Sequence, residues 1–444
     1  MPTVSAARWQ AVAFLFALEK GEAYSDLALK ARLDEARLDK RDAALCTRLC
    51  FGVLENQALL DYYIGHYSSV PLRKMHPRVR AILRVGAYQL LFMDKIPPSA
   101  AVNEAVATAK ATRNGAASGL INAVLRRLAE HKENLPEIEA ETEEERLAIR
   151  YSHPLWLVRK LISQFGSQTA DLLAANNSAP PTSVRVNRLK ATKEEAVAAL
   201  EAEGVSVEED PWLDSLYLSE SGALDELSAF QKGLVTAQDK AAQLASLALS
   251  PQPGSFVIDG CAAPGGKSLH MAALMENKGQ ILSFDIFENK LSQIAENARR
   301  IGATCITPKL GDGRVFLPEL EKKADFVMAD VPCSNLGIIR KKPDVRFKKP
   351  EDIEKMPELQ LAIMENLSRY VKPGGVMVYA TCTILREENE DNVSAFLQKH
   401  RDFSLEPFFE DFPALFQVPA GQLTLYPHIH QTDGFFMARL RRKA

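Results

Sequence analysis

The sequence lacks the features of an exported or membrane-spanning protein. Its 444 residues include only six cysteines, too few and too scattered for a disulfide framework. The N-terminal stretch "MPTVSAARWQAVAFLFALEKG" has one early arginine, a short apolar run that ends at Glu19, and no small-residue cleavage site. No run of 18 uncharged apolar residues occurs in the chain. We therefore predict a cytoplasmic protein without a membrane segment.

An excess of charge of one sign is also absent. The formal net charge of −3 argues against a uniformly basic nucleic-acid binder, although it leaves room for local basic patches. The chain is too long for one compact core and indicates two to four domains, at roughly 150 residues each.

Residue clusters suited to metal binding are lacking as well. Cys46 and Cys50 are four residues apart on one face of a predicted helix, but no second pair accompanies them. His428 and His430 likewise stand without partners in the sequence. We predict apolar packing for the two cysteines, a structural role for the two histidines, and no metal site.

Three regions of different pattern follow one another. Residues 1–135 read as entirely helical, with Val79, Ile82, Leu83, Leu90 and Leu91 on one apolar stripe at helical spacing. The acidic segment "ENLPEIEAETEEER" then predicts an exposed linker or helix start.

Residues 148–235 mix helix and strand patterns. "PLWLVRKLISQFG" is helix-like, "TSVRVNRL" alternates as a strand, and "TKEEAVAALEAEG" predicts a helix with Thr192 as its N-cap and Gly204 at its end. A small α+β domain is expected here.

From residue 236 to 444, short apolar strands alternate with helices. We predict strands at 255–259, 280–285, 325–330 and 376–381, arranged by βαβ units in a parallel sheet with helices on both faces. Ligands bind such α/β sheets at the carboxyl ends of the strands. Three of these strands end in an aspartate, at Asp259, Asp285 and Asp330, which predicts a site at that edge.

The loop "DGCAAPGGKS" nearly matches a phosphate-binding loop, but Cys261 stands where that motif needs glycine. Its Pro-Gly-Gly turn before a helix N-terminus suits a carboxylate, and Lys267 adds positive charge. Asp285, at the end of the next strand, is placed to accept hydrogen bonds from ribose hydroxyls. These features favour S-adenosylmethionine, with a dinucleotide or a phosphate ligand as the alternatives.

Two further stretches, "DVPCSNLGIIRKKPDVR" and "YATCTILREENEDN", each place a cysteine just beyond a strand end. A single cysteine is more often buried filler, but Cys333 and Cys382 both lie in polar loops at the predicted ligand edge. The pair therefore predicts thiol chemistry.

With these motifs, supported by "FQKGLVTAQDKAAQL" and "YPHIHQTDGFFMARL", the sequence resembles the RNA (cytosine-5)-methyltransferases, and among them the RsmB branch that modifies 16S ribosomal RNA. The helical first region, with "AVNEAVATAK" and "GLINAVLRRL", resembles the NusB-like RNA-binding domain of that branch. The resemblance implies a multidomain chain: an all-α NusB-like domain, a small α+β domain, and a Rossmann-like class I methyltransferase domain. Asn335 and Thr383 stand where the family often has Gly and Ser, and we expect neither to touch the chemistry.

The resemblance also implies residue roles. Cytosine C5 is a poor nucleophile until a nucleophile adds to C6. Cys382 matches the attacking thiolate, Cys333 the group that assists release, and Asp330 a partner for the N3 and N4 edge of the base. The residues implied in binding S-adenosylmethionine are Cys261, Ala262, Ala263, Pro264, Gly265, Gly266, Lys267, Asp285, Lys290, Asp312 and Asp330.

The implied substrate is a cytosine of 16S ribosomal RNA, naked or in an assembling small subunit, and the base must be single-stranded or flipped out. A basic cluster beside Cys333 predicts phosphate contacts by Arg340, Lys341, Lys342, Arg346, Lys348 and Lys349. Nothing in the sequence requires a dimer, so we expect a monomer. The alternatives are methylation of another RNA such as tRNA, a P-loop-like NTPase that uses Asp330 for magnesium, and a non-catalytic RNA-binding assembly factor.

Overall fold

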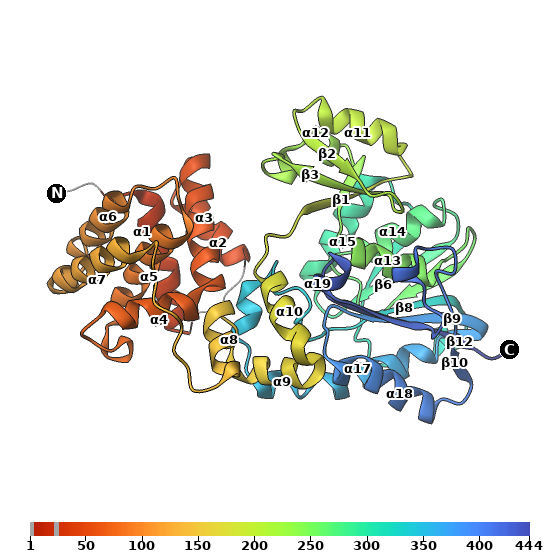
Figure 1. The fold of residues 1–444 in the computed structure, drawn as a ribbon. Coiled ribbons are helices and arrows are strands. Elements are labelled where there is room, and N and C mark those ends of the chain that lie inside the picture. The colour runs from red at the N-terminus through yellow and green to blue at the C-terminus, as the bar shows by residue number, and fades with distance from the viewer. Residues whose placement is uncertain (1–3, 22–25) are drawn as a thin grey trace. The chain divides into compact units, whose positions relative to one another are not determined.

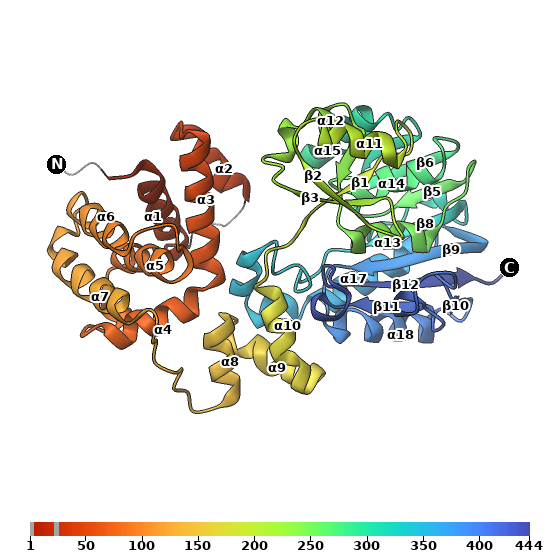
Figure 2. The same ribbon diagram turned by 45° about the horizontal axis from the view of Figure 1, so that its top comes forward.

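The computed structural model describes residues 4–21 and 26–444 (Figures 1 and 2). The chain forms two compact units, one of residues 1–177 with 342–347 and the other of residues 178–341 with 348–444. No helix within the described ranges is long and apolar enough to cross a membrane.

The first unit is helical, as the sequence predicts. Three helices beyond residue 135 also belong to it. One of them begins at Glu143, in the acidic segment predicted as a linker or helix start, and the sequence pattern grouped the other two with the α+β region. Its α-helices are α1 (Ala6–Glu19), α2 (Asp26–Glu35), α3 (Lys40–Glu55), α4 (Gln57–Tyr67), α5 (Pro77–Phe92), α6 (Pro98–Lys110), α7 (Ser118–His131), α8 (Glu143–Tyr151), α9 (Leu155–Phe165) and α10 (Thr169–Asn176).

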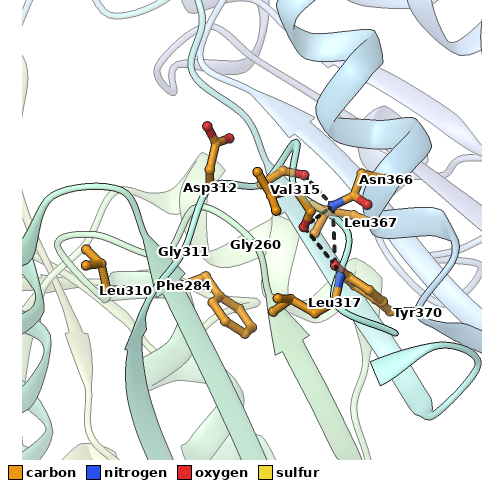
Figure 3. A pocket seen from close by; sticks show the side chains of 11 residues that line it. Gly260, Phe284, Leu310, Gly311, Asp312, Val315, Leu317, Asn366, Leu367 and Tyr370 are labelled. Atoms are coloured by element: carbon orange, nitrogen blue, oxygen red, sulfur yellow. Dashed lines mark hydrogen bonds between the residues drawn. The ribbon is translucent and has the colours of Figure 1, made fainter. Parts of the chain in front are cut away.

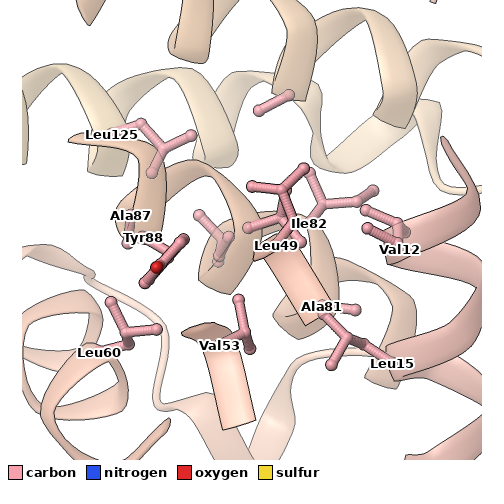
Figure 4. Close-up of a cluster of buried hydrophobic side chains, with 14 of the residues drawn as sticks. Val12, Leu15, Leu49, Val53, Leu60, Ala81, Ile82, Ala87, Tyr88 and Leu125 are labelled. Carbon is pink, nitrogen blue, oxygen red and sulfur yellow. The ribbon is translucent and has the colours of Figure 1, made fainter. Parts of the chain in front are cut away.

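Helix α5 runs through the middle of this unit's core (Figure 4). Four of the five stripe residues predicted from the sequence are buried in it, and Leu91 packs against it partly exposed. Burial extends around the helix, because Ala81, Ala87 and Tyr88 are also buried. A helix surrounded by others needs apolar residues on more than one face.

In the second unit, a four-stranded antiparallel sheet has the order β2-β3-β1-β4. Thr192 is the N-cap of helix α11 (Lys193–Glu201), as predicted, and forms a capping box with Glu195. Gly204 turns the chain after this helix with a positive φ of 81°. The elements are β1 (Thr182–Val186), α11 (Lys193–Glu201), β2 (Ser206–Glu209), β3 (Ser215–Ser219), α12 (Ser228–Gln231) and β4 (Val235–Ala237).

The larger sheet of this unit has the order β10-β12-β9-β8-β5-β6-β7, with β11 paired to β12. The four predicted strands are confirmed as β5, β6, β8 and β9, and they are parallel to their neighbours within this part of the sheet. The strands are β5 (Phe256–Asp259), β6 (Gln280–Asp285), β7 (Ile306–Leu310), β8 (Ala324–Asp330), β9 (Val371–Thr381), β10 (Phe403–Leu405), β11 (Gln422–Leu425) and β12 (Phe435–Arg442).

Helices cover both faces of this sheet, as predicted (Figure 1). Successive strand residues enter opposite cores: Val257 packs with α13, α14 and α15, whereas Ile258 packs with α17 and α18. The helices are α13 (Lys240–Leu249), α14 (Gly266–Leu274), α15 (Glu288–Ile301), α16 (Pro350–Ile353), α17 (Met356–Ser368), α18 (Glu390–Lys399) and α19 (Pro427–His430).

Two parts of the sheet were not anticipated. Strand β7 extends one edge, and the antiparallel strands β10, β11 and β12 extend the other. The basic C-terminal segment is therefore part of a buried strand, in which Arg439 and Arg441 pair with Glu406.

Candidate active site

The carboxyl ends of the parallel strands surround a cavity of about 460 Å³. The loops after β5, β6, β8 and β9 all contribute to it, as the topology requires. Eight of the thirteen predicted catalytic and cofactor-binding residues line it. The lining includes Gly260, Cys261, Ala263, Asp285, Ile286, Phe287, Lys290, Asp312, Gly313, Arg314, Asp330, Cys333, Asn335 and Cys382.

Cys333 and Cys382 lie at this cavity with their sulfur atoms 3.2 Å apart, although 49 positions separate them in the sequence. Cys333 is buried and Cys382 is half-buried. The hydrogen bond with Cys382, together with burial, raises the pKa of the Cys333 thiol well above its usual value. Cys333 is thus held protonated beside a more accessible thiol.

The buried carboxylate of Glu388 holds the two cysteine loops together. It accepts a hydrogen bond from the Ser334 backbone N–H at 2.9 Å and another from the Thr383 hydroxyl at 3.2 Å. These partners directly follow the two cysteines. A third bond comes from the Gln360 side chain at 2.7 Å. No signal in the sequence points to this role of Glu388, because residue type alone does not tell a buried carboxylate from an exposed one.

The backbone of the two loops is also in close contact. Gly337 donates its N–H to the Cys382 carbonyl at 3.0 Å. A Cβ on Gly337 would lie 2.0 Å from the Gly434 carbonyl oxygen, so only glycine fits there.

Lys267 and Asp330 form an ion pair at 2.6 Å beside the thiols. Burial alone would lower the pKa of Lys267, but the Asp330 carboxylate outweighs it and the pKa is raised. The ammonium group also lies 5.1 Å from the ring centre of Phe435. Lys267 is therefore paired with Asp330, which lines the cavity together with the two thiols.

The loop between β5 and α14 forms a tight turn. Gly265 takes φ +105° as the N-cap of α14, a conformation that favours glycine, and the Ala263–Pro264 peptide is cis. Cys261 is partly buried, and burial raises the pKa of its thiol, so it is a neutral lining group. The first amides of α14 follow the turn, where a carboxylate would be stabilised.

Asp285 and Asp312 complete the predicted cofactor groups. Asp285 accepts the Phe287 N–H at 3.0 Å through one oxygen. Asp312 is half-buried and pairs with Arg314 at 2.6 Å, which lowers the pKa of its carboxyl. An adjoining cavity of about 150 Å³ is lined by apolar side chains, among them Phe284, Val315, Leu317 and Tyr370. In Figure 3 the Asp312 side chain points away from these side chains.

The lining of the main cavity fits a nucleoside that carries an amino acid. Ile286 and Phe287 are each about half exposed at its edge, 53% and 50%, so they offer apolar surface to a flat ring. The carboxylates of Asp285 and Asp312 line the same cavity, and carboxylate oxygens accept hydrogen bonds from hydroxyl and amino groups. Lys290 lies over Phe287, 4.5 Å from its ring centre, and also borders the cavity.

The predicted phosphate-binding residues divide into two groups. Arg340 and Arg346 are buried: Arg340 pairs with Asp433 at 2.8 Å, and Arg346 donates to backbone carbonyls such as that of Glu55, at 2.7 Å. Burial lowers the pKa of Arg346 to about 10. The structure gives both side chains internal partners in place of the solvent-facing position that phosphate contact requires.

The lysines of the same segment are more accessible. Lys341 pairs with Asp239 and Asp433, at 2.8 and 2.6 Å, and the Lys348 ammonium donates to the Ser334 carbonyl at 2.8 Å. Lys342 and Lys349 are exposed. Phosphate contact from this segment stays a prediction, and it is strongest for these last two.

The candidate metal-binding residues have other surroundings. Cys46 and Cys50 are fully buried in the apolar core of the first unit, as predicted. The ring Nδ1 of His430 accepts the Tyr426 N–H at 2.9 Å, which is a structural role. The described ranges contain no group of three or more metal-ligating side chains.

The fold and this site define a Rossmann-like, S-adenosylmethionine-dependent methyltransferase with helical and antiparallel-sheet regions before its catalytic domain. The chain belongs to the family of ribosomal RNA small subunit methyltransferase B. Three family models match: 16S rRNA methyltransferase RsmB/F over residues 246–441, the NusB family over 5–130, and an RsmF/B-like ferredoxin-like domain over 153–225.

Similar proteins match over nearly the whole chain. A probable ribosomal RNA small subunit methyltransferase B of Bacillus subtilis is 37% identical and covers 97% of both chains. A ribosomal RNA small subunit methyltransferase B of Salmonella newport is 36% identical and covers 96% of both. The solved structure of PH0851 is 30% identical with a TM-score of 0.81, and it covers 99% of both. NSun6 from Pyrococcus horikoshii, solved with SFG, is 25% identical with a TM-score of 0.57; it covers 64% of this chain and 97% of its own.

These findings confirm the family resemblance, the fold class and the cofactor predicted from the sequence. The protein is a ribosomal RNA methyltransferase, which decides against the NTPase alternative.

Proposed function

We propose that the protein methylates C5 of a cytosine in 16S ribosomal RNA through a covalent bond between Cys382 and C6 of the base. The observation that carries the proposal is the pair of thiols 3.2 Å apart at the cavity, beside the Lys267–Asp330 ion pair. Methyl transfer to an oxygen or an exocyclic nitrogen needs no thiol, whereas C5 of cytosine becomes nucleophilic only after addition at C6.

The proposed sequence begins at Cys382. Its thiolate forms the S–C6 bond, and the electron pair of the C5–C6 double bond makes C5 nucleophilic. S-adenosylmethionine, when bound, supplies an electrophilic methyl group. Loss of the C5 proton then restores the double bond as the C6–S bond breaks.

Cys333 is placed to assist that last step. Its protonated thiol, 3.2 Å from the Cys382 sulfur, can donate its proton to the departing thiolate. The resulting Cys333 thiolate can accept the proton that leaves C5, so Cys333 ends the cycle as it began. Cys382 ends it as a thiol and must release that one proton to solvent before the next attack. Asp330, oriented by Lys267, is assigned to the N3 and N4 edge of the cytosine.

Binding of the cofactor is assigned to the loop of residues 261–267, with Asp285 at the ribose and Asp312 at the adenine amino group. Lys290 is assigned to the outer wall of the same site. The proposed substrate surface includes the exposed Lys342 and Lys349, whose charges would attract the RNA backbone.

The test is a denaturing gel after incubation with S-adenosylmethionine and unmodified 16S ribosomal RNA, naked or in a small-subunit particle. We expect a protein–RNA adduct to accumulate with Cys333→Ala and to be absent with Cys382→Ala. Cys50→Ala, which removes a thiol from the helical core, is the matched control and should behave as the unmodified protein. Methylation by Cys382→Ala at the normal rate would refute the proposal.

The position of the new methyl group separates the remaining alternatives. Mass spectrometry of digested RNA distinguishes 5-methylcytosine from methylation elsewhere on the base. Parallel reactions with transfer RNA test the alternative substrate, and faster methylation of it would move the proposal to that RNA class.

A further inference from the structure

The side chain of Asn335 contacts both thiols of the site. Its carboxamide Oδ1 lies 2.8 Å from the Cys382 sulfur and 3.7 Å from the Cys333 sulfur, with each thiol as donor. Asn335 is half-buried and lines the main cavity. The expectation that this residue lies away from the chemistry is therefore wrong.

The backbone at Asn335 indicates that the contact is specific to this side chain. Its φ is +62°, in the left-handed region where glycine is unstrained and asparagine is the best tolerated of the other residues. The chain thus carries a side chain where none is needed for the turn, and that side chain ends on the nucleophilic sulfur.

We propose that Asn335 is a further active-site residue, whose carboxamide oxygen accepts a hydrogen bond from the Cys382 thiol and holds that thiol in place. The catalytic meaning of this contact rests on the proposed function of Cys382. A hydrogen bond accepted from the neutral form of an acid stabilises that form, whereas the same oxygen repels a thiolate.

Other charged groups act on the same thiol. Lys267 is close enough to interact with Cys382 electrostatically and favours the thiolate, while Asp330 partly neutralises Lys267. Cys333 is hydrogen-bonded to Cys382. The Glu388 carboxylate acts electrostatically on Cys333. Asn335 and Lys267 thus act on the same thiol, the first through a hydrogen bond and the second through its charge.

The experiment measures the pH dependence of Cys382 alkylation by iodoacetamide in the full-length protein, without RNA. Peptide mass spectrometry follows Cys382 and Cys333 separately, because tryptic cleavage places them in different peptides. In Asn335→Gly the side chain is lost without backbone strain. In Asn335→Asp a carboxylate replaces the amide. Asn277→Gly, also at a positive φ of 58° but at the end of α14, is the matched control.

With Asn335→Gly we expect the midpoint of the alkylation profile to fall by about half a pH unit, and with Asn335→Asp to rise by at least as much. The Asn277→Gly profile should match the unmodified protein. An unchanged midpoint in Asn335→Gly, or a rise that would mean the amide N–H faces the thiolate, overturns the inference.

The outcome is independent of the RNA adduct test. If Cys382→Ala still formed the adduct, the proposed function would fail while the alkylation result stood. If the adduct test succeeded and the alkylation midpoint did not move, only the role of Asn335 would fall.

Discussion

The molecule contains two pairs of neighbouring cysteines in opposite surroundings. Cys46 and Cys50 lie one turn apart on helix α3, fully buried among apolar side chains. Cys333 and Cys382 come from distant loops and meet at a cavity lined by charged and polar groups. In each pair the two thiols are hydrogen-bonded to each other, so that contact does not distinguish them. We expect solvent access and the neighbouring charges to decide which pair of thiols is reactive.

The largest expected difference between the pairs is in methyl transfer. Cys382→Ala removes the group proposed to make C5 nucleophilic, and we expect the single-turnover rate to fall by about three orders of magnitude or more. Cys50→Ala removes the same atom from the core and should leave the rate within about twofold. Transfer of a labelled methyl group to 16S ribosomal RNA measures both. Comparable losses in the two variants would show that the pairs are not functionally distinct.

Reactivity toward a small alkylating agent should differ by about two orders of magnitude between the pairs in the folded protein. Cys382 is half-buried at a cavity, whereas burial raises the pKa of Cys50 well above its usual value and leaves it no access to solvent. Alkylation of each cysteine-containing peptide over time at pH 8 measures the ratio. Addition of urea is the control, because unfolding should remove the difference.

The next largest effect is expected from Lys267, whose positive charge lies beside Cys333 and Cys382. Lys267→Met leaves the Asp330 carboxylate without its 2.6 Å partner, and we expect kcat to fall by about 10- to 100-fold. The change in cofactor affinity should be smaller, since the rest of the 261–267 loop remains to bind the cofactor and the Lys267 ammonium group is paired with Asp330. Lys278→Met, at an exposed ion pair with Glu276, is the control. An effect confined to cofactor binding would instead support the carboxylate-binding role expected from the sequence.

The sequence predicted much of the fold because buried parallel strands show as short apolar runs between helices. The four runs appear as β5, β6, β8 and β9, and three of them end in aspartate as expected. Strand β12 was missed because the charges of "RLRR" hide its apolar residues. Its arginines lie in the sheet with Glu406 as partner, which no local pattern reveals.

The site was predictable in its members but not in its pairings. Strand-end position was enough to bring Cys333 and Cys382 together, because loops at one edge of a parallel sheet must meet. The partner of Lys267, the buried state of Arg346 and the contact of Asn335 with the thiols depend on atoms from other parts of the fold. A run of basic residues in sequence likewise says nothing about which of them turn inward.

The smallest expected effect is on stability, where substitution in the buried pair should cost more than substitution in the pair at the cavity. Cys50→Ser puts a hydroxyl into the apolar core of the first unit, and we expect a cost of about 1–3 kcal/mol. Cys333→Ser places the same hydroxyl beside Asn335 and Cys382, which can hydrogen-bond to it, so the cost should stay below about 1 kcal/mol. Thermal unfolding of the full chain should show a midpoint several degrees lower only for Cys50→Ser. Equal shifts would mean that the loop cysteines are packed as tightly as those of the core, and the contrast between the pairs would then rest on charge alone.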